Sequence, residues 1–195
     1  MGKFRCFWLL AIAASFGLAG TTPVVADGEF FQLDFAPRAS TVVGSLVRGR
    51  VGTALGWSEY DSGSAFSANV TYSFALPVLG SGALLRVGPS VRLDQDNEMD
   101  QGLKFVYERW IPTEWGGVFT LADYNSIHEE YLFLGELSHQ SSGLSASFAV
   151  QGDESGFREN TVVFGYAVPN SRARLRLGYR YEAHQMFVGF SVNTF

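Results

Sequence analysis

The stretch Phe66–Leu76, FSANVTYSFAL, decides the fold class of this chain. Its apolar side chains fall at every second position: Phe66, Ala68, Val70, Tyr72, Phe74 and Leu76. The side chains between them are small and polar: Ser67, Asn69, Thr71 and Ser73. Successive side chains of a β-strand point to opposite faces of the sheet, and no helical period produces this alternation. The stretch is therefore predicted to be a strand with one apolar and one polar face.

Segments with the same alternation recur along the rest of the chain. Together with Phe66–Leu76 they predict about ten strands, with eight or twelve as the alternatives. The other segments are Val47–Trp57, Ala83–Leu93, Leu103–Ile111, Gly117–Asp123, Glu130–Ser138, Leu144–Gln151, Glu159–Val168, Arg172–Tyr181 and Met186–Phe195. Segment 27–44 could add an eleventh strand, which the even strand number of single-chain bacterial barrels disfavours. We interpret it as an N-terminal extension, a plug or an extra strand.

The connections between these segments are of two kinds that alternate along the chain. Compact turns begin at Pro77, Pro112, His139 and Pro169, and the other connections are polar and mostly longer, such as Asp94–Gly102. Short turns at one end and longer loops at the other are typical of an up-and-down antiparallel meander. The predicted fold is all-β, an antiparallel barrel over residues 45–195.

The N-terminal segment 1–26 has the pattern of an export signal. Lys3 and Arg5 precede the apolar run Phe7–Ala19, and small residues follow up to Ala26, where cleavage is predicted. The run is too short for a membrane-spanning helix. The only cysteine, Cys6, lies inside this segment, so the exported chain has no disulfide. The formal net charge of −5 argues against binding to nucleic acid.

Alternation alone does not say which face is wet, and a soluble periplasmic ligand-binding barrel stays an alternative. Segments of about ten residues are long enough to cross a bilayer at a tilt. Aromatic residues near the segment ends, such as Trp57, Tyr124 and Tyr179, suit the two membrane interfaces. These features favour a transmembrane barrel.

The C-terminal residue Phe195 resembles the insertion signal of Gram-negative outer-membrane β-barrels, whose last strand ends in an aromatic residue. The resemblance implies a location in the bacterial outer membrane, recognition by the barrel-insertion machinery, and contact with outer-membrane lipid and lipopolysaccharide. The apolar set Met186, Val188, Phe190 and Val192 is one step out of phase with Phe195, which a strand bulge would explain. The oligomeric state stays open.

Sorting the charged residues by face predicts a strongly basic lumen. The inward-facing basic residues would be Arg48, Arg50, Arg86, Arg92, Lys104, Arg172, Arg174, Arg176 and Arg180. The inward-facing acids would be Glu108, Glu136 and Glu159. A salt-bridged and hydrated interior that fills the barrel is one interpretation. The other is that an anion neutralises the surplus, either a plug made by Asp27, Glu29 and Asp34 or a permeating solute.

The polar loops are acidic, and we interpret them as solvated surface. Alternatively, Asp94, Asp96, Glu98 and Asp100 bind divalent cations that bridge to lipopolysaccharide phosphates. The run lacks the glycine and spacing of an EF-hand loop. The sequence predicts no cofactor and no dedicated metal site.

Two enzyme families of the outer membrane share fragments with this sequence. His139 and Ser141, with Glu154 downstream, resemble the catalytic residues of lipid A deacylases, although Ser142 replaces the asparagine of that family. The pair Asp94 and Asp96, and the pair Glu182 and His184, resemble the rim residues of omptin proteases, but this chain is much shorter than an omptin. The favoured function is non-catalytic: structural, surface-interacting or a narrow channel. A lipid A-modifying esterase is the main alternative.

Overall fold

The computed structural model describes residues 27–60, 63–96 and 98–195, and the predicted export signal lies outside this range. The described chain forms a closed barrel in which each strand pairs with its sequence neighbours, and the first strand pairs with the last. The strands are β1 Gly28–Phe35, β2 Ala39–Arg48, β3 Val51–Tyr60, β4 Gly63–Ala75, β5 Ala83–Asp94, β6 Met99–Thr113, β7 Gly116–Asn125, β8 Glu130–His139, β9 Leu144–Gly152, β10 Arg158–Ala167, β11 Ala173–Arg180 and β12 Gln185–Asn193. A 3₁₀ turn, η1 at Pro77–Leu79, lies between β4 and β5.

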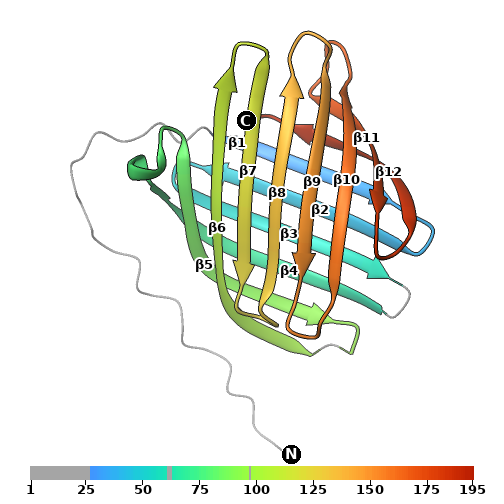
Figure 1. Ribbon diagram of the computed structural model, residues 1–195. Helices are drawn as coiled ribbons and strands as arrows, with labels where there is room; N and C mark the ends of the chain where they lie inside the picture. The colour runs from blue at the N-terminus through green and yellow to red at the C-terminus, as the bar shows by residue number, and fades with distance from the viewer. Residues whose placement is uncertain (1–26, 61–62, 97) are drawn as a thin grey trace, which may run out of the picture.

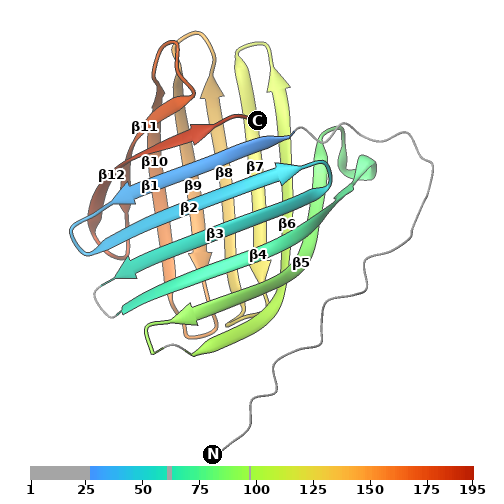
Figure 2. The same cartoon turned by 180° about the vertical axis from the view of Figure 1, so that it is seen from behind.

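All the pairings are antiparallel, which confirms the predicted fold class. One wall contains β6 to β10, and β1 to β4 cross behind it at a steep angle (Figures 1 and 2). Strongly tilted strands on opposite walls of a barrel cross in this way. No helix in the described part of the chain is long and apolar enough to cross a membrane.

The barrel has twelve strands, the larger of the two alternatives to about ten. The difference lies at the N-terminal end, where β1 and β2 occupy residues assigned to an extension or plug, and close the barrel against β12. Their alternation is weak because several lumen-facing positions are apolar, including Phe30, Val43 and Val47. The period-two signal disappears when both faces of a strand are apolar.

A two-residue turn at Gly49 and Arg50 separates β2 from β3 inside the predicted segment Val47–Trp57. Gly49 has a φ of 57°, which glycine adopts without steric cost. Across this turn Val47 pairs with Gly52 and Arg48 with Val51. The prediction of one continuous strand placed Arg48 in the lumen. Because the chain turns at Gly49 and Arg50, Val47 faces the lumen and Arg48 faces outward.

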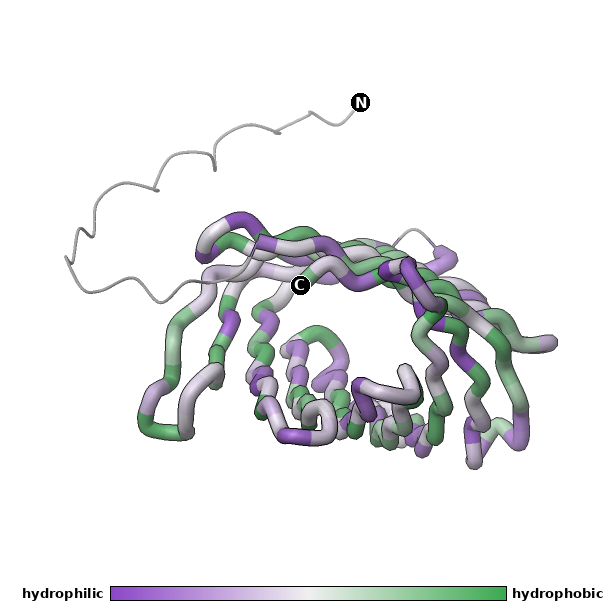
Figure 3. Tube along the Cα trace, turned by 90° about the horizontal axis from the view of Figure 1, so that it is seen from above, coloured by the Kyte–Doolittle hydropathy of each residue, from purple (hydrophilic) through white to green (hydrophobic). Residues whose placement is uncertain are grey.

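The outer face of the barrel is a broad apolar surface. Many large outward-facing side chains are more than a third exposed, and some more than half, for example Leu55 at 56%, Phe164 at 61% and Met186 at 60%. The side chains between them on the same strands face the lumen, and hydrophilic and hydrophobic residues alternate along the trace (Figure 3). A continuous exposed apolar surface of this extent is the feature of a barrel that contacts lipid.

Outward-facing charged side chains in the described strands lie near strand ends: Glu29, Arg48, Glu59 and Arg158. The exception, Arg109 of β6, lies under the β4–β5 turn, where a Cβ added to Gly80 would come within 2.2 Å of the Arg109 guanidinium. The middle of the outer surface is thus free of charge over the residues that the structure describes. This arrangement avoids the cost of placing a charge in hydrocarbon.

Candidate functional site: the lumen and its rims

Each end of the barrel carries a set of turns. The terminal rim holds the start of β1, the end of β12 and the turns 49–50, 76–82, 114–115, 140–143 and 168–172. The distal rim holds the connections 36–38, 126–129, 153–157 and 181–184, together with the ends of β3 and β5 and the starts of β4 and β6. The lumen runs between these two rims.

The strand register places the charged side chains that face the lumen. The basic ones are Arg86, Arg92, Lys104, Arg174, Arg176 and Arg180. The acidic ones are Asp34, Asp94, Asp100, Glu108, Asp123, Glu130, Glu136 and Glu159. Carboxylates therefore outnumber basic groups in the described lumen. The prediction of a strongly basic lumen is wrong.

Asp34 and Arg176 form the most enclosed ion pair, with side chains 5% and 14% exposed. Arg176 donates from Nε to Asp34 Oδ1 at 2.9 Å and from Nη2 to Oδ2 at 3.2 Å, and Gln32 donates to the same Oδ2 at 2.7 Å. The two residues lie on β1 and β11 and reach each other across Gly189 of β12, where an added Cβ would be 2.1 Å from Asp34 Oδ1. Glycine on the intervening strand makes this bidentate pair possible.

Other long basic side chains pair in a similar manner. Arg174 Nη1 lies 2.6 Å from Glu136 Oε1, and its side chain passes over Gly165 of β10. Lys104 Nζ lies 2.9 Å from Asp123 Oδ2, and the Nε of Arg86 donates to a Glu108 oxygen at 3.0 Å. These pairs link β11 to β8, β6 to β7 and β5 to β6.

Near the distal rim, Arg92 joins two acidic residues. Its Nε donates to Asp94 Oδ1 at 2.7 Å, and its Nη1 is ion-paired with Glu130. Asn125 extends the network, accepting a hydrogen bond of 2.8 Å from Ser90 and donating to Glu130. This cluster therefore contains two carboxylates and one guanidinium, that of Arg92.

Arg180 differs from the other lumen-facing basic residues because none of the ion pairs formed by described residues includes it. It donates weakly to Ala39 O at 3.4 Å and to Thr41 Oγ1 at 3.5 Å. Its guanidinium lies 5.2 Å from the centre of the Phe187 ring, a cation–π contact. Arg180 is thus held by a cation–π contact and two long hydrogen bonds.

Three residues predicted to face the lumen lie at the terminal rim instead. Arg48 points outward and pairs with Glu29 at 2.7 Å. Arg50 is in the β2–β3 turn and contacts the Tyr72 hydroxyl on the outer face. Arg172 precedes β11 and is exposed. The strand register places the remaining members of the predicted network on the lumen face: Arg86, Arg92, Lys104, Glu108, Glu136, Arg174, Arg176 and Arg180.

Three acidic residues of the lumen that sequence reasoning missed lie near the ends of strands. Asp94 ends β5 and Asp100 is the second residue of β6, although both were assigned to the connection Asp94–Gly102. Asp123, near the end of β7, is the last residue of the predicted segment Gly117–Asp123. Asp123 lies two residues after Leu121 on the same face, so the alternation of the segment places it in the lumen. Strand ends are the least certain part of such a prediction.

The three carboxylates predicted to form an acidic plug do not form one. Asp34 and Glu29 are residues of β1, with ion-pair partners Arg176 and Arg48. Asp27 accepts a hydrogen bond of 2.7 Å from the backbone of Gly49. All three carboxylates thus belong to the wall and its rim.

The deacylase-like residues do not come together. His139 and Ser141 lie at the terminal rim, where the Ser141 hydroxyl is 3.4 Å from the imidazole and Ser142 is closer, at 2.8 Å. Glu154 lies at the distal rim, and the whole of β9 separates it from His139. The carboxylate cannot orient the imidazole across that length, so the structure gives no support to the esterase alternative.

The omptin-like residues are engaged in other contacts. Asp94 is held by Arg92, Asp96 is in the β5–β6 turn, and His184 contacts the Tyr179 hydroxyl at 3.4 Å. Glu182 accepts hydrogen bonds from the backbone and side chain of Asn160 at 2.6 and 2.5 Å. The Asn160 backbone N–H and a hydrogen bond with Glu159 lower the pKa of Glu182. Glu182 therefore acts as a turn-stabilising carboxylate.

The C-terminal residue Phe195 lies beyond β12, against Gly28 at the start of β1. The register of β12 with β1 and β11 is continuous, so its phase needs no bulge. Thr194, the preceding residue, is hydrogen-bonded to the backbone of Glu29. The out-of-phase ring thus covers a glycine at the β1–β12 seam.

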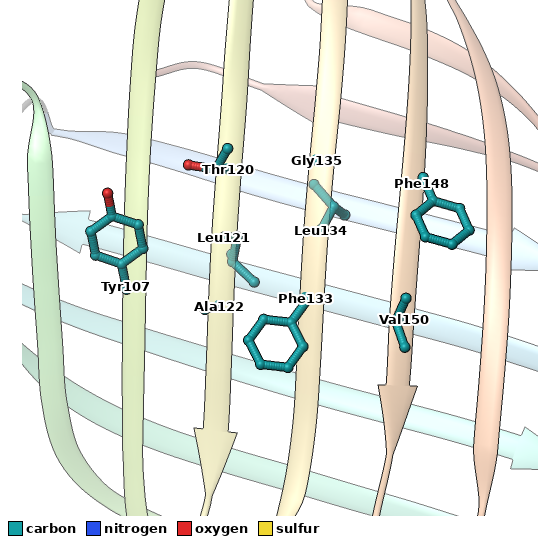
Figure 4. Close-up of a pocket in the computed structure, with 9 residues that line it drawn as sticks. All are labelled: Tyr107, Thr120, Leu121, Ala122, Phe133, Leu134, Gly135, Phe148 and Val150. Atoms are coloured by element: carbon teal, nitrogen blue, oxygen red, sulfur yellow. The ribbon is translucent and has the colours of Figure 1, made fainter.

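A shallow depression on the outer wall is lined by Tyr107, Thr120, Leu121, Ala122, Phe133, Leu134, Gly135, Phe148 and Val150 (Figure 4). Its floor is Gly135, beside which no atom lies within 4 Å of an added Cβ. The lining is apolar apart from two hydroxyl groups. It is a feature of the apolar outer surface and contains no charged group for a hydrophilic solute.

No protein-family model matches the sequence, and no curated protein matches it. Solved structures do resemble the fold. The KdgM porin, also solved "in complex with disordered oligogalacturonate", superposes with a TM-score of 0.57 at 10% and 11% identity, over 86% of this chain and 99% of that one. A structure from a study of in-meso crystallization of membrane proteins has a TM-score of 0.52 at 11% identity, covering 86% of this chain and 83% of the other.

The fold and the lumen together define a class of protein. A closed antiparallel barrel with an apolar outside and a charged interior is a transmembrane β-barrel of the outer-membrane type. Within that class this chain has the twelve-stranded fold of a small porin.

Proposed function

We propose that the protein is a narrow outer-membrane channel for small hydrophilic solutes, with no catalytic role. The observation that carries this proposal is the division of the wall: apolar side chains cover the outside, and the charged side chains in the middle of the strands face inward as ion pairs. A charged lumen can be hydrated by water and ions, and an apolar exterior can contact lipid. A soluble barrel would instead need its polar side chains on the outside.

The orientation follows from the even number of strands. Both ends of the described barrel lie at the terminal rim, which we propose faces the periplasm, as in bacterial barrels of this kind. Export by the segment 1–26 and insertion aided by Phe195 are parts of the same proposal. Outer-membrane lipid and lipopolysaccharide are the expected contacts of the outer face and the distal rim.

The solutes of this protein need not be of the same class as oligogalacturonate, the polyanion found in complex with the KdgM porin. A pathway for a polyanion needs unpaired positive charge along it. In this lumen Arg86, Arg174 and Arg176 are paired with carboxylates, and Arg180 alone lacks such a partner among the described lumen-facing basic residues. We therefore propose neutral or weakly cationic small solutes.

Recording from planar lipid bilayers tests the channel. The refolded protein is expected to give discrete conductance steps in KCl. Ala54→Trp, on the lumen face of β3, should reduce the step size, whereas Thr53→Trp, one residue away on the outer face, should leave it unchanged. If both variants fold and neither alters the current, or wild-type protein gives none, the channel is excluded and a structural role remains.

A further inference from the structure

Three residues with metal-binding side chains converge at the distal rim from separate parts of the chain. Asp94 ends β5, Asp100 lies at the start of β6, and His128 lies in the β7–β8 turn. The Nε2 of His128 is 3.3 Å from Asp100 Oδ2 and 3.9 Å from Asp94 Oδ2. The three atoms that could bind a metal ion all lie within 4.8 Å of one another. A single ion could contact all of them after a small adjustment of the side chains.

The groups behind these atoms hold them in a suitable orientation. The other ring nitrogen of His128, Nδ1, lies 3.4 Å from Glu154 Oε1, in the β9–β10 turn. A carboxylate on the far nitrogen of a metal-bound imidazole fixes its tautomer and raises its basicity. Asp94 uses Oδ1 for Arg92 at 2.7 Å, which leaves Oδ2 turned toward His128. The imidazole thus has a supporting carboxylate on one side and two open carboxylate oxygens on the other.

The charge around this cluster favours a cation. Asp94, Asp100 and Glu154 surround the imidazole, and Glu130 lies on the other side of Arg92. Arg92 is the basic side chain that contacts the cluster among the described residues, and it neutralises only part of this charge. A divalent cation between the carboxylates would remove their mutual repulsion.

We propose that Asp94, Asp100 and His128 bind a divalent transition-metal ion of the zinc type, with Glu154 as the carboxylate that positions the imidazole. Zinc takes imidazole nitrogen and carboxylate oxygen together, whereas calcium and magnesium take oxygen ligands. The site is partly exposed, with His128 at 39%, so water can complete the coordination. This assignment differs from a site made only of carboxylates, because it depends on the imidazole.

The expected effect of the ion is mechanical. It would join the β5–β6, β7–β8 and β9–β10 connections at the mouth of the lumen. Local opening of these turns then requires loss of the ion, and binding stabilises the folded form by mass action. The site is independent of whether the lumen conducts.

Titration calorimetry of the full chain, folded in detergent micelles and free of chelator, tests the proposal with ZnCl₂ as the probe. Wild-type protein should bind about one ion per chain. His128→Asn and Asp100→Asn should each weaken binding at least about tenfold, and Glu154→Gln about tenfold. His184→Asn, in another distal turn, and His139→Asn, at the terminal rim, are the matched controls and should bind as wild type does.

Several results would overturn the site. No zinc binding by wild-type protein excludes it, and equal loss in the control histidine variants indicates adventitious binding to surface histidines. Displacement of zinc by an equal concentration of CaCl₂ would show a carboxylate site that does not need His128. Folding of each variant is checked by the shift of the band on gels before and after boiling. If His128→Asn does not fold, His128→Gln replaces it in the titration. A rise in the unfolding temperature of wild-type protein with added zinc then tests binding independently of any variant.

Discussion

The buried carboxylate of Asp34 can remain charged because both of its oxygens accept hydrogen bonds. Its two oxygens accept from Arg176 and Gln32, and the pair lies over Gly189. Half of this arrangement could be predicted from sequence, since the alternation around Arg176 places it in the lumen. The partner could not, because Asp34 is 142 positions away in the chain and meets Arg176 only through closure of the barrel.

We expect Asp34→Asn to destabilise the barrel by about 3 kcal/mol, since it leaves the guanidinium of Arg176 enclosed without a counter-charge. Urea unfolding in lipid vesicles measures the change. Glu29→Gln is the control, because the Glu29–Arg48 pair is exposed, and it should cost less than about 1 kcal/mol. Equal effects of the two substitutions would show that enclosure of the pair contributes nothing.

The glycines of the wall give a second test at the scale of single residues. Gly189→Ala should destabilise the protein by about 1–3 kcal/mol, because the added Cβ would lie 2.1 Å from Asp34 Oδ1 and 2.4 Å from the Leu33 carbonyl. Gly135→Ala, in a strand with open space beside the glycine, should instead stabilise it by about 0.5 kcal/mol. The same unfolding experiment compares them, and a harmless Gly189→Ala would refute the close packing.

At the scale of the strand, prediction succeeded where the two faces differ in chemistry. In β4 every apolar residue from Phe66 to Phe74 faces outward, as the alternation predicted. In β1 and β2 it failed, because Phe30, Val43 and Val47 put apolar side chains on the lumen side too. The interior of a narrow barrel is filled by side chains of both kinds, so a strand can belong to the wall without alternating.

The two faces of β4 can be compared directly with one substitution. Ala68→Lys places an ammonium group on the outer face near the middle of the strand, and we expect a loss of about 2–4 kcal/mol in a lipid bilayer. Asn69→Lys makes the same change one residue along, in the lumen, and should cost clearly less because water and carboxylates are available there. Refolding yield and urea unfolding in vesicles measure both, and equal losses would contradict a lipid-facing outer wall.

At the scale of the whole molecule, small errors in strand length changed the sign of the predicted lumen charge. Asp94 and Asp100 became lumen residues because β5 and β6 extend past their predicted ends, whereas Asp123, the last residue of its predicted segment, was not counted among the inward-facing acids. Arg48 and Arg172 lie at the rim. The class of fold was robust to these errors because it rests on many strands. The electrostatics were not, because they depend on a few residues near the ends of those strands.

If the protein conducts as proposed, its ion selectivity measures the net charge of the lumen. With carboxylates in the majority along the described lumen, we expect a KCl gradient across a bilayer to give a reversal potential of the cation-selective sign, weaker at high salt because mobile ions screen fixed charge. Glu108→Gln combined with Glu136→Gln frees Arg86 and Arg174 from their partners and should shift the potential toward anion selectivity. Glu29→Gln, which removes an outward-facing acid at the terminal rim, should not shift it. An anion-selective wild-type channel would instead mean that Arg180 and the other guanidinium groups dominate the pathway despite their partners, and would make acidic solutes the better candidates.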